Sequence, residues 1–327
     1  MTDLSFLEAS TAALAEEMRR DERVWALGED LGRGGLFHQY AGLAEAFGPE
    51  RILDAPISES AILGVAVGAA LNGTRPVAEM RLCDFAVCAV DELVNQAAKN
   101  RYMFGGQGRI PLVVRQPCGI GRSTAAQHSQ SLEAWYVHVP GLVVLAPSTP
   151  ADNYGLLRAA IRNDDPVVYF EHKRLWPVRG EVELGSEPVP IGEAAHRRRG
   201  SDLTVVTWSS MVSAAEEAAD ALAADDGVSV DLIDLRSLWP WDEEAVLESA
   251  ARTGRLLVVH EAVRVGGFGA EIAATVGERL GVPMRRVGAP RVPVPYSPPL
   301  EAAVRVGAAD IIDTARELLG LRPLTAA

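Results

Sequence analysis

Short apolar runs alternate with longer helical patterns along the first half of the chain. The runs at residues 24–28, 51–55, 75–80, 111–115, 142–146 and 166–171 are nearly continuous, as expected for strands covered on both faces of a parallel sheet. Helical patterns lie between them, at residues 5–20, 58–71, 84–102, 132–138 and 151–162. This alternation predicts a doubly wound α/β domain.

The pattern is interrupted near residue 173, where prolines and glycines collect and no period is visible as far as residue 200. We interpret residues 176–200 as a linker. A second alternation follows, with strands expected at 203–208, 228–234 and 255–260 and helices near 213–224, 242–252, 270–280 and 308–319. The sequence therefore predicts two doubly wound α/β domains, at residues 1–175 and 201–327.

Composition supports two domains with sizeable cores, because 48% of the 327 residues are hydrophobic and 23% are charged. The net charge of −13 argues against nucleic acid or an anionic membrane as the main partner. The one basic run, Arg197–Arg199, is interpreted as a solvated turn. We expect no secretory signal and no membrane span, since the longest apolar run is about half of the length a span needs. Three cysteines without zinc-like spacing are expected to be free thiols in the cytoplasm.

Several common nucleotide-binding and catalytic motifs are missing. The chain has no Gly-Lys pair of a phosphate loop and no Gly-x-Ser-x-Gly elbow. Residues 266–269 (Gly-Gly-Phe-Gly) follow a predicted strand and precede a predicted helix. They lack the full spacing of a dinucleotide-binding turn, so a tight strand-to-helix turn is the better interpretation.

Residues 54–61 (Asp-Ala-Pro-Ile-Ser-Glu-Ser-Ala) read as a strand end, a turn and a helix start. Ser58 could cap the helix, and Glu59 in the first turn suits the helix dipole. Taken alone, the segment requires no function. The same string, however, is one of a series of ordered and correctly spaced motifs that cover nearly the whole chain.

This series resembles the β subunits of thiamine-diphosphate-dependent pyruvate, branched-chain and acetoin dehydrogenases, which belong to the transketolase-like superfamily. The resemblance implies a transketolase-like pyrimidine-binding domain followed by a transketolase C-terminal domain. The other motifs that carry it are residues 26–30 (ALGED), 75–79 (RPVAE), 95–99 (NQAAK), 127–131 (QHSQS), 140–142 (PGL), 147–150 (PSTP), 165–168 (DPVV), 171–173 (EHK), 260–261 (HE), 266–271 (GGFGAE) and 293–301 (PVPYSPPLE).

The resemblance implies roles for three residues near the cofactor. Glu59 would bond a ring nitrogen of the cofactor's aminopyrimidine, because a proton shared there favours the imino form that takes the thiazolium proton. We expect Glu59 to lie beside the apolar Ile57, Ile62 and Leu63. Phe85 matches the aromatic residue that packs on the pyrimidine ring. Glu29 matches an acidic residue that links two cofactors through a polar path, although a plain carboxylate at a strand end explains it nearly as well.

His128 matches a histidine that lies near the substrate and the incoming lipoyl group in relatives, where a side chain that titrates near neutral pH suits proton transfer. Arg81 departs from the family pattern. It could contact an acidic substrate or pair with Asp84 or Glu79, and the sequence does not choose between these.

The resemblance also implies cations. A potassium site would fall on Leu112, Ala160, Asn163 and Asp165, with backbone carbonyls from the two apolar residues. A diphosphate needs a divalent cation with oxygen ligands, and relatives in the wider group hold magnesium with a Gly-Asp-Gly sequence. This chain contains none. We therefore expect an α subunit to carry the diphosphate and magnesium, in a heterotetramer of two α and two β chains.

The function implied by the resemblance is oxidative decarboxylation of a 2-oxoacid, pyruvate as the first choice, with transfer of the acyl group to lipoamide on an acyltransferase core. Acetoin dehydrogenase is an alternative, and so is a split transketolase-like carboligase that uses thiamine but not lipoamide. A non-catalytic scaffolding paralogue is a third alternative, which the presence of both Glu59 and His128 disfavours. The branched-chain enzyme matches less well at residues 126–128.

Overall fold

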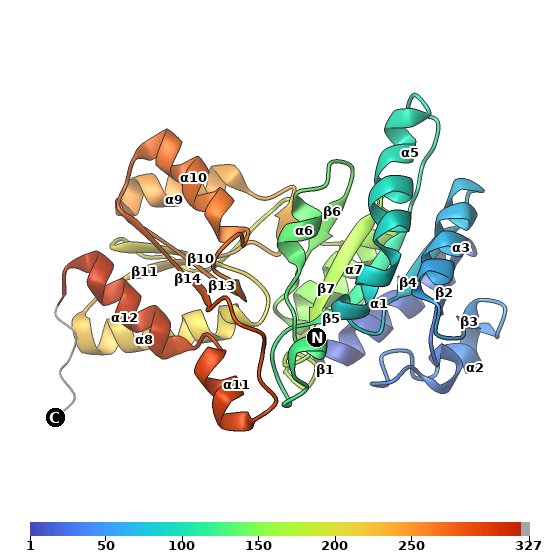
Figure 1. Ribbon diagram of the computed structural model, residues 1–327, viewed down its shortest axis with the longest axis horizontal. Helices are drawn as coiled ribbons and strands as arrows, with labels where there is room; N and C mark the ends of the chain where they lie inside the picture. Colours follow the sequence, from blue (N-terminus) through green and yellow to red (C-terminus); the bar gives the residue numbers. More distant parts are fainter. Residues whose placement is uncertain (322–327) are drawn as a thin grey trace. The chain divides into compact units, whose positions relative to one another are not determined.

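A computed structural model of the protein describes residues 1–321 (Figure 1). The chain divides into two compact units. The first consists of Met1–Gly119, Trp135–Ile191 and Leu238–Pro240, and the second of Ile120–Ala134, Gly192–Ser237 and the chain from Trp241 onward. Each unit is a parallel or mostly parallel sheet with helices on both faces, as the sequence pattern predicts.

The first unit contains a seven-stranded sheet in the order β12-β6-β7-β5-β4-β2-β3. Its strands are β2 (Val24–Gly28), β3 (Ile52–Asp54), β4 (Arg75–Glu79), β5 (Val113–Cys118), β6 (Val143–Leu145), β7 (Val167–His172) and β12 (Ser237–Trp239). A small antiparallel pair, β1 (Thr2–Ser5) with β8 (Arg179–Val182), accompanies it.

Helices cover both faces of this sheet. The residues of α1 (Phe6–Arg20) and α7 (Pro150–Arg162) share one apolar core with β2, β4 and β7. The buried residues of α3 (Glu59–Leu71) lie outside that core, so α3 covers the opposite face, together with α5 (Ala98–Met103). Short helices complete the unit: α2 (Leu43–Phe47), α4 (Cys83–Ala86) and α6 (Glu133–Val137).

The second unit has a five-stranded sheet in the order β14-β13-β10-β11-β9. Helices α8 and α12 share its apolar core on one face, and α9 and α10 pack on the other (Figure 1). The elements are β9 (Ala195–Arg198), β10 (Leu203–Thr207), α8 (Met211–Asp226), β11 (Val230–Asp234), α9 (Glu243–Thr253), β13 (Leu256–Val263), α10 (Gly269–Leu280), β14 (Met284–Ala289), α11 (Pro298–Val304) and α12 (Ala308–Leu319).

One local prediction is confirmed and one is wrong. The helix expected at residues 84–102 is found, as an unbroken helical segment from Cys83 to Met103. Its turns change from α-helical to 3₁₀ and then to π-helical over Glu92–Ala97 before α5. The buried positions 86, 89, 93 and 97 keep a helical spacing throughout, so the apolar pattern does not reveal this change of helix type. The run Arg197–Arg199 is not a solvated turn, because β9 includes Arg197 and Arg198 and the guanidinium group of Arg197 binds the buried Asp234 at 2.7 Å.

Two other predictions are confirmed. Residues 266–269 form the tight turn between β13 and α10. Cys83, Cys88 and Cys118 are free thiols. Among the described residues, no helix is long and apolar enough to cross a membrane.

Candidate active site

The carboxyl ends of β2, β3 and β4 lie side by side at one edge of the seven-stranded sheet, since β2 pairs in parallel with both neighbours. Glu29 follows β2, and Glu59 begins α3 five residues after the end of β3. Phe85 lies in α4, shortly after β4. Parallel α/β sheets bind their ligands at this edge, so the fold gathers three of the predicted site residues there.

Hydrogen bonds hold these loops together. The Ala55 amide donates to the Gly28 carbonyl at 2.8 Å, and the Gly32 amide donates to the Asp54 carboxylate at 2.7 Å. The Ser60 hydroxyl donates to the Cys88 carbonyl at 2.7 Å, which ties the first turn of α3 to the segment that carries Phe85. Glu59 is therefore placed by contacts on both sides of its helix terminus.

Two expectations about the surroundings of Glu59 are wrong. Ser58 occupies the N-cap position of α3, but its hydroxyl donates to the Pro56 carbonyl and does not cap the helix. Ile62 and Leu63 are buried, whereas Ile57 is 78% exposed and points away from the core. Glu59 itself is half-buried, so one side of this acid is open at the surface of the chain.

Arg81 pairs with neither Asp84 nor Glu79. Its Nη1 atom lies 3.0 Å from Glu29 Oε2 and 3.1 Å from Asp30 Oδ2. Asp30 has a positive φ of 58°, a conformation that costs energy for a residue other than glycine. One guanidinium group thus holds two carboxylates at the end of β2, and Glu29 has a specific partner within the chain.

A buried polar network lies among the strands below this edge. The Arg115 guanidinium contacts the Glu171 carboxylate at 2.7 Å and the Glu79 carboxylate at 3.6 Å. The Tyr40 hydroxyl donates to Glu79 at 2.9 Å. Burial raises the pKa of Glu79 to about 7, although Arg115 opposes the shift.

The sequence pattern does not predict this network as a unit. The signal for it was a charged residue at a buried position in each of three mostly apolar runs, at Glu79, Arg115 and Glu171. Charged residues are rarely fully buried unless they are paired, so such positions point toward one another.

His128 belongs to the second unit, whereas Glu29, Glu59 and Phe85 belong to the first. It is exposed and ends a 3₁₀ turn, Ala126–His128. The preceding loop has positive φ values at Arg122, Ser123 and Ala125. Strained backbone of this kind clusters at functional sites, and it presents the His128 side chain at the surface.

Two further contacts order the His128 loop. The Thr124 hydroxyl donates to the Gly121 carbonyl at 3.2 Å and lies 3.1 Å from the Ser129 hydroxyl. A cavity of about 540 Å³ in the second unit is lined by Gln127, Ser129 and Glu261, among others. The Glu261 carboxylate accepts the Ile120 amide at 2.6 Å, which anchors the start of the loop.

The four residues of the predicted potassium site all lie in the first unit. The carbonyls of Leu112 and Ala160 each accept a backbone hydrogen bond, from Val167 at 2.8 Å and from Asn163 at 3.2 Å. The Asn163 amide group donates to the Asp165 carbonyl at 3.0 Å. A carbonyl oxygen has a second lone pair, so this site stays a prediction.

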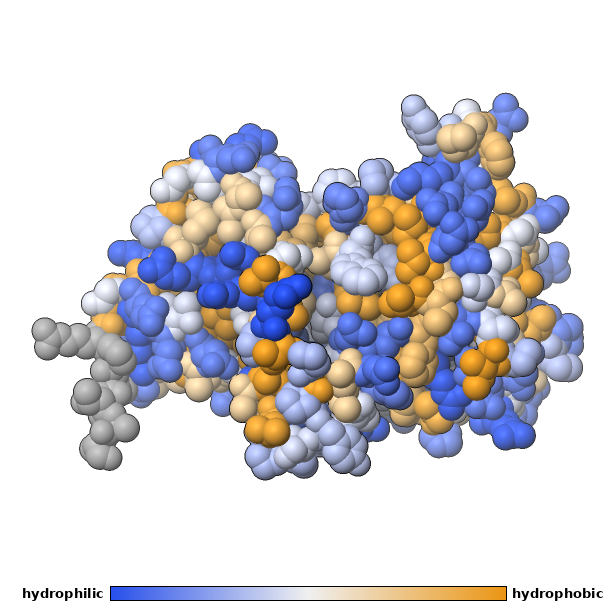
Figure 2. All heavy atoms as spheres, in the orientation of Figure 1, coloured by the Kyte–Doolittle hydropathy of each residue, from blue (hydrophilic) through white to orange (hydrophobic). Residues whose placement is uncertain are grey.

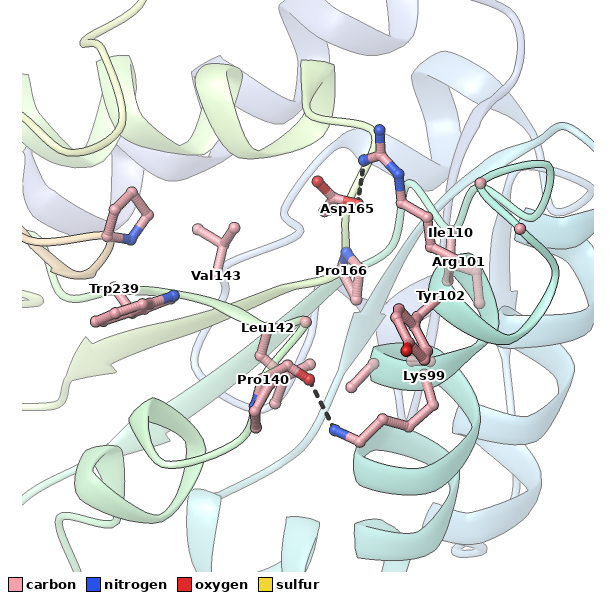
Figure 3. Close-up of a pocket in the computed structure, with 16 residues that line it drawn as sticks. Lys99, Arg101, Tyr102, Ile110, Pro140, Leu142, Val143, Asp165, Pro166 and Trp239 are labelled. Carbon is pink, nitrogen blue, oxygen red and sulfur yellow. Dashed lines mark hydrogen bonds and ion pairs between the residues drawn. The ribbon is translucent and has the colours of Figure 1, made fainter.

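The first unit also contains a cavity of about 940 Å³ beside α5 (Figure 3). Its wall is mostly apolar, and Lys99 and Arg101 reach across it to Pro140 and Asp165, as the dashed lines mark. Of the predicted site residues, Asp165 alone lines it. Among residues 1–321, no group of three or more His, Cys, Asp or Glu side chains could hold a metal ion.

Comparison with known proteins identifies both parts of the chain. Residues 2–178 match the transketolase pyrimidine-binding domain, and residues 192–311 match the transketolase C-terminal domain. The 2-oxoisovalerate dehydrogenase subunit beta of Bacillus subtilis is 44% identical, over 97% of this chain and 99% of that protein. The subunit beta of acetoin:2,6-dichlorophenolindophenol oxidoreductase of Cupriavidus necator is 43% identical, over 97% of both chains.

A third relative is the pyruvate dehydrogenase E1 component subunit beta of Rickettsia felis, 40% identical over 95% of this chain and 97% of that one. Among solved structures, one described as a split gene transketolase in an inactive beta4 tetramer superposes with a TM-score of 0.82. It is 25% identical and covers 98% of this chain and 99% of its own. The names of the relatives differ in substrate, and their identities differ by only a few per cent.

Proposed function

Since the chain belongs to the family of β subunits of 2-oxoacid dehydrogenases, built from transketolase pyrimidine-binding and C-terminal domains, we propose that it is half of a thiamine-diphosphate-dependent 2-oxoacid dehydrogenase. The reaction is decarboxylation of a 2-oxoacid, with pyruvate as the first candidate, and transfer of the acyl group to lipoamide. The observation that carries the proposal is the place of Glu59, a half-buried acid at the N-terminus of α3 and at the ligand-binding edge of the sheet.

The residues of this chain bind and orient the cofactor and move protons. Thiamine diphosphate, when bound, supplies the carbon nucleophile and the electron sink for decarboxylation. With the cofactor bound, Glu59 would hold a proton at a ring nitrogen of the aminopyrimidine, and Phe85 would pack on that ring. His128 moves a proton at the substrate, where its exposed position gives it access.

Glu29 has a role through Arg81. The ion pairs at 3.0 and 3.1 Å share the single positive charge of Arg81 between Glu29 and Asp30 and fix both carboxylates at the end of β2. In this proposal Arg81 orients the acidic path and does not bind the substrate carboxylate, since two carboxylates of the chain already occupy it.

A partner chain completes the site. Helix α3 is apolar around its circumference, yet Val65 is 56% exposed and Leu71 is 40% exposed. A side chain at Gly68 would meet no atom within 4 Å, so the outer face is open and shallow. A helix that is apolar all round is normally buried, which supports a subunit interface on the face next to Glu59.

The α subunit would bring the diphosphate and magnesium site, because this chain lacks the Gly-Asp-Gly sequence that serves it. The proposed assembly has two α and two β chains and works with a lipoyl acyltransferase core. The potassium site at Leu112, Ala160, Asn163 and Asp165 remains part of the proposal as a structural cation.

Two other enzymes compete. The similarity to an acetoin oxidoreductase subunit supports acetoin as the substrate. The split gene transketolase that shares the fold supports a carboligase that does not use lipoamide. The substrate assay below separates all three.

The decisive experiment is co-expression with an α-type partner and assay of dye reduction with thiamine diphosphate and magnesium, over pyruvate, branched-chain 2-oxoacids and acetoin. Glu59→Gln should abolish turnover in the assembled complex. The matched control is Glu181→Gln, which changes an exposed glutamate of β8 in the same unit and should leave the rate unchanged. If the complex is stable and binds the cofactor, but none of the tested substrates supports dye reduction, the dehydrogenase is refuted and the carboligase is favoured.

The interface is tested separately. Val65→Asp should prevent co-purification with the α-type partner, because a charge would enter an apolar interface. Leu184→Asp is the control, since Leu184 is also exposed, at 50%, but lies outside α3. Equal co-purification of both variants would show that the outer face of α3 does not bind the partner.

A further inference from the structure

Four arginines line a cavity of about 430 Å³ in the second unit. Arg264 follows the end of β13, Arg286 lies in β14, Arg291 follows β14, and Arg305 follows α11. β13 and β14 are parallel neighbours, so the cavity lies at the carboxyl ends of adjacent strands, where α/β sheets bind ligands. Figure 2 shows hydrophilic residues gathered over this part of the second unit.

None of these four guanidinium groups forms an ion pair with a carboxylate of residues 1–321. Within the described part of the chain, the hydrogen bond that these guanidinium groups form runs from Arg286 Nη1 to the Arg264 carbonyl at 3.0 Å. The Arg264 amide in turn donates to the Ala289 carbonyl at 3.0 Å. These bonds fix the backbone at the cavity. They leave the four guanidinium groups without an ion pair among residues 1–321, on a chain whose net charge is −13.

The positive charge of Arg286 affects the buried side chain of His260. His260 is fully buried, and burial lowers its pKa to about 4, with the positive charge of Arg286 as a further cause. Arg286 is only partly exposed. Its charge is therefore felt inside the unit, where solvent screens it less than at the surface.

The opposite wall of the cavity comes from α12 and offers hydrogen-bond acceptors. Asp310 uses its carboxylate to accept the Gly307 amide at 2.8 Å, which fixes the start of the helix. Asp313 is exposed and lines the cavity with Thr314. A ligand that fits both walls carries negative charge at one end and hydroxyl donors at the other.

We propose that this cavity binds a phosphorylated, hydroxyl-bearing metabolite of the sugar-phosphate class. The phosphate would bind the arginines, since guanidinium groups match phosphate oxygens in pairs, and hydroxyl groups would donate to Asp313. The volume suits a small metabolite, because small-molecule cavities measure about 300–1,000 Å³. The site lies in the second unit and does not depend on the function proposed above.

The test is calorimetric titration of glucose 6-phosphate into the full-length chain, alone and in complex with its α-type partner, at low chloride concentration. Arg286→Gln and Arg305→Gln should each weaken binding by about tenfold or more, since a charged hydrogen bond contributes about 1.5–3 kcal/mol. Arg285→Gln is the matched control: Arg285 is the neighbour of Arg286 in β14 but does not line the cavity. Asp313→Asn should weaken the binding of glucose 6-phosphate without weakening the binding of inorganic phosphate.

Three results would overturn the proposal. The first is the absence of saturable binding in the wild-type chain. The second is an equal loss in Arg285→Gln, which would indicate a general charge effect. The third is equal affinity for glucose 6-phosphate, inorganic phosphate and citrate, which would show that the arginines attract any anion. Circular dichroism of each variant checks that a loss of binding does not come from unfolding. Arg286 lies in β14 and Arg305 follows α11, so the two variants test the site from different segments.

Discussion

His260 makes the stability of the second unit depend on pH, and one substitution should remove this dependence. Its side chain is fully buried, stacked on Trp208 at 5.4 Å, and its Nδ1 atom lies 3.0 Å from the Ala262 carbonyl. A side chain at Gly267 or Gly269 would clash with its ring, at 2.6 and 2.7 Å. The Nε2 atom is buried without a hydrogen-bond partner among residues 1–321. Because burial disfavours the charged imidazolium, the folded unit favours the neutral ring.

The size of the effect follows from the pKa shift. The ordinary pKa of 6.5 falls to about 4 in the folded chain. Because the folded pKa is depressed, the unfolded chain binds the proton first, and stability is lost as pH falls from 6.5 toward 4. Between pH 7 and pH 5 the loss from this group is about 2 kcal/mol, and it approaches about 3 kcal/mol below pH 4.

The substitution His260→Phe keeps the stacked ring and removes the titration. At pH 7 the variant should be less stable by about 1 kcal/mol, because it loses the hydrogen bond to Ala262. At pH 5 it should be more stable than the wild type by about 1 kcal/mol. At this pH a proton binds His260 in the unfolded wild type, which stabilises the unfolded state relative to the folded one. The sign of the difference therefore reverses between the two conditions.

Hydrogen exchange of the β13 and α10 peptides, compared between variant and wild type at each pH, measures this difference within the second unit. The comparison at a single pH cancels the intrinsic pH dependence of exchange. His138→Gln is the control, because His138 is exposed and belongs to the first unit, so its substitution should leave the exchange of the β13 and α10 peptides unchanged at both pH values. A His260→Phe difference that keeps its sign and size from pH 7 to pH 5 would show that protonation of His260 does not control the stability of this unit.

Two further predictions concern the first unit. Burial raises the pKa of Glu79 to about 7, so the protonated form is favoured in the folded chain and stability should be lost as pH rises through 7; Glu79→Gln should remove this loss in denaturant unfolding at pH 6 and pH 8. The double variant Arg81→Met, Glu29→Gln should lose less free energy of unfolding than the two single variants lose in sum. The difference, the coupling energy of the 3.0 Å ion pair, should be about 1 kcal/mol. Additive effects in that double-mutant cycle would show that the pair does not stabilise the chain.

The architecture could be predicted from the sequence because most strands of the two main sheets are covered on both faces and read as apolar runs. The helix expected at residues 308–319 has the bounds of α12, and those expected at 242–252 and 270–280 differ from α9 and α10 by one residue. The edge strands β8 and β9 were not predicted. Each has four residues, several of them charged, and an edge strand with polar side chains carries little periodic signal.

Site residues could be placed on elements but not in contact with one another. The sequence put Glu59 at a helix start and Glu29 at a strand end, and both are found there. It could not show that Arg81 reaches Glu29 and Asp30, because that contact joins the ends of two strands that are about 50 residues apart along the chain. The exposure of Ile57 was also hidden, since an apolar residue next to a helix start is expected to be buried unless another chain covers it.

The placement of Glu59 connects assembly with chemistry in the proposed enzyme. The same helix α3 begins with the acid and continues with an exposed apolar face at Ala61, Gly64 and Val65, while Ile62 and Leu63 anchor it in the unit. A rigid helix transmits a displacement along its length, so a partner that packs on Val65 also fixes the position of Glu59. Its half-open side is then covered, and water is excluded from the acid only after association. An isolated β chain should therefore be folded but inactive, for the physical reason that its acid and its interface are parts of one element.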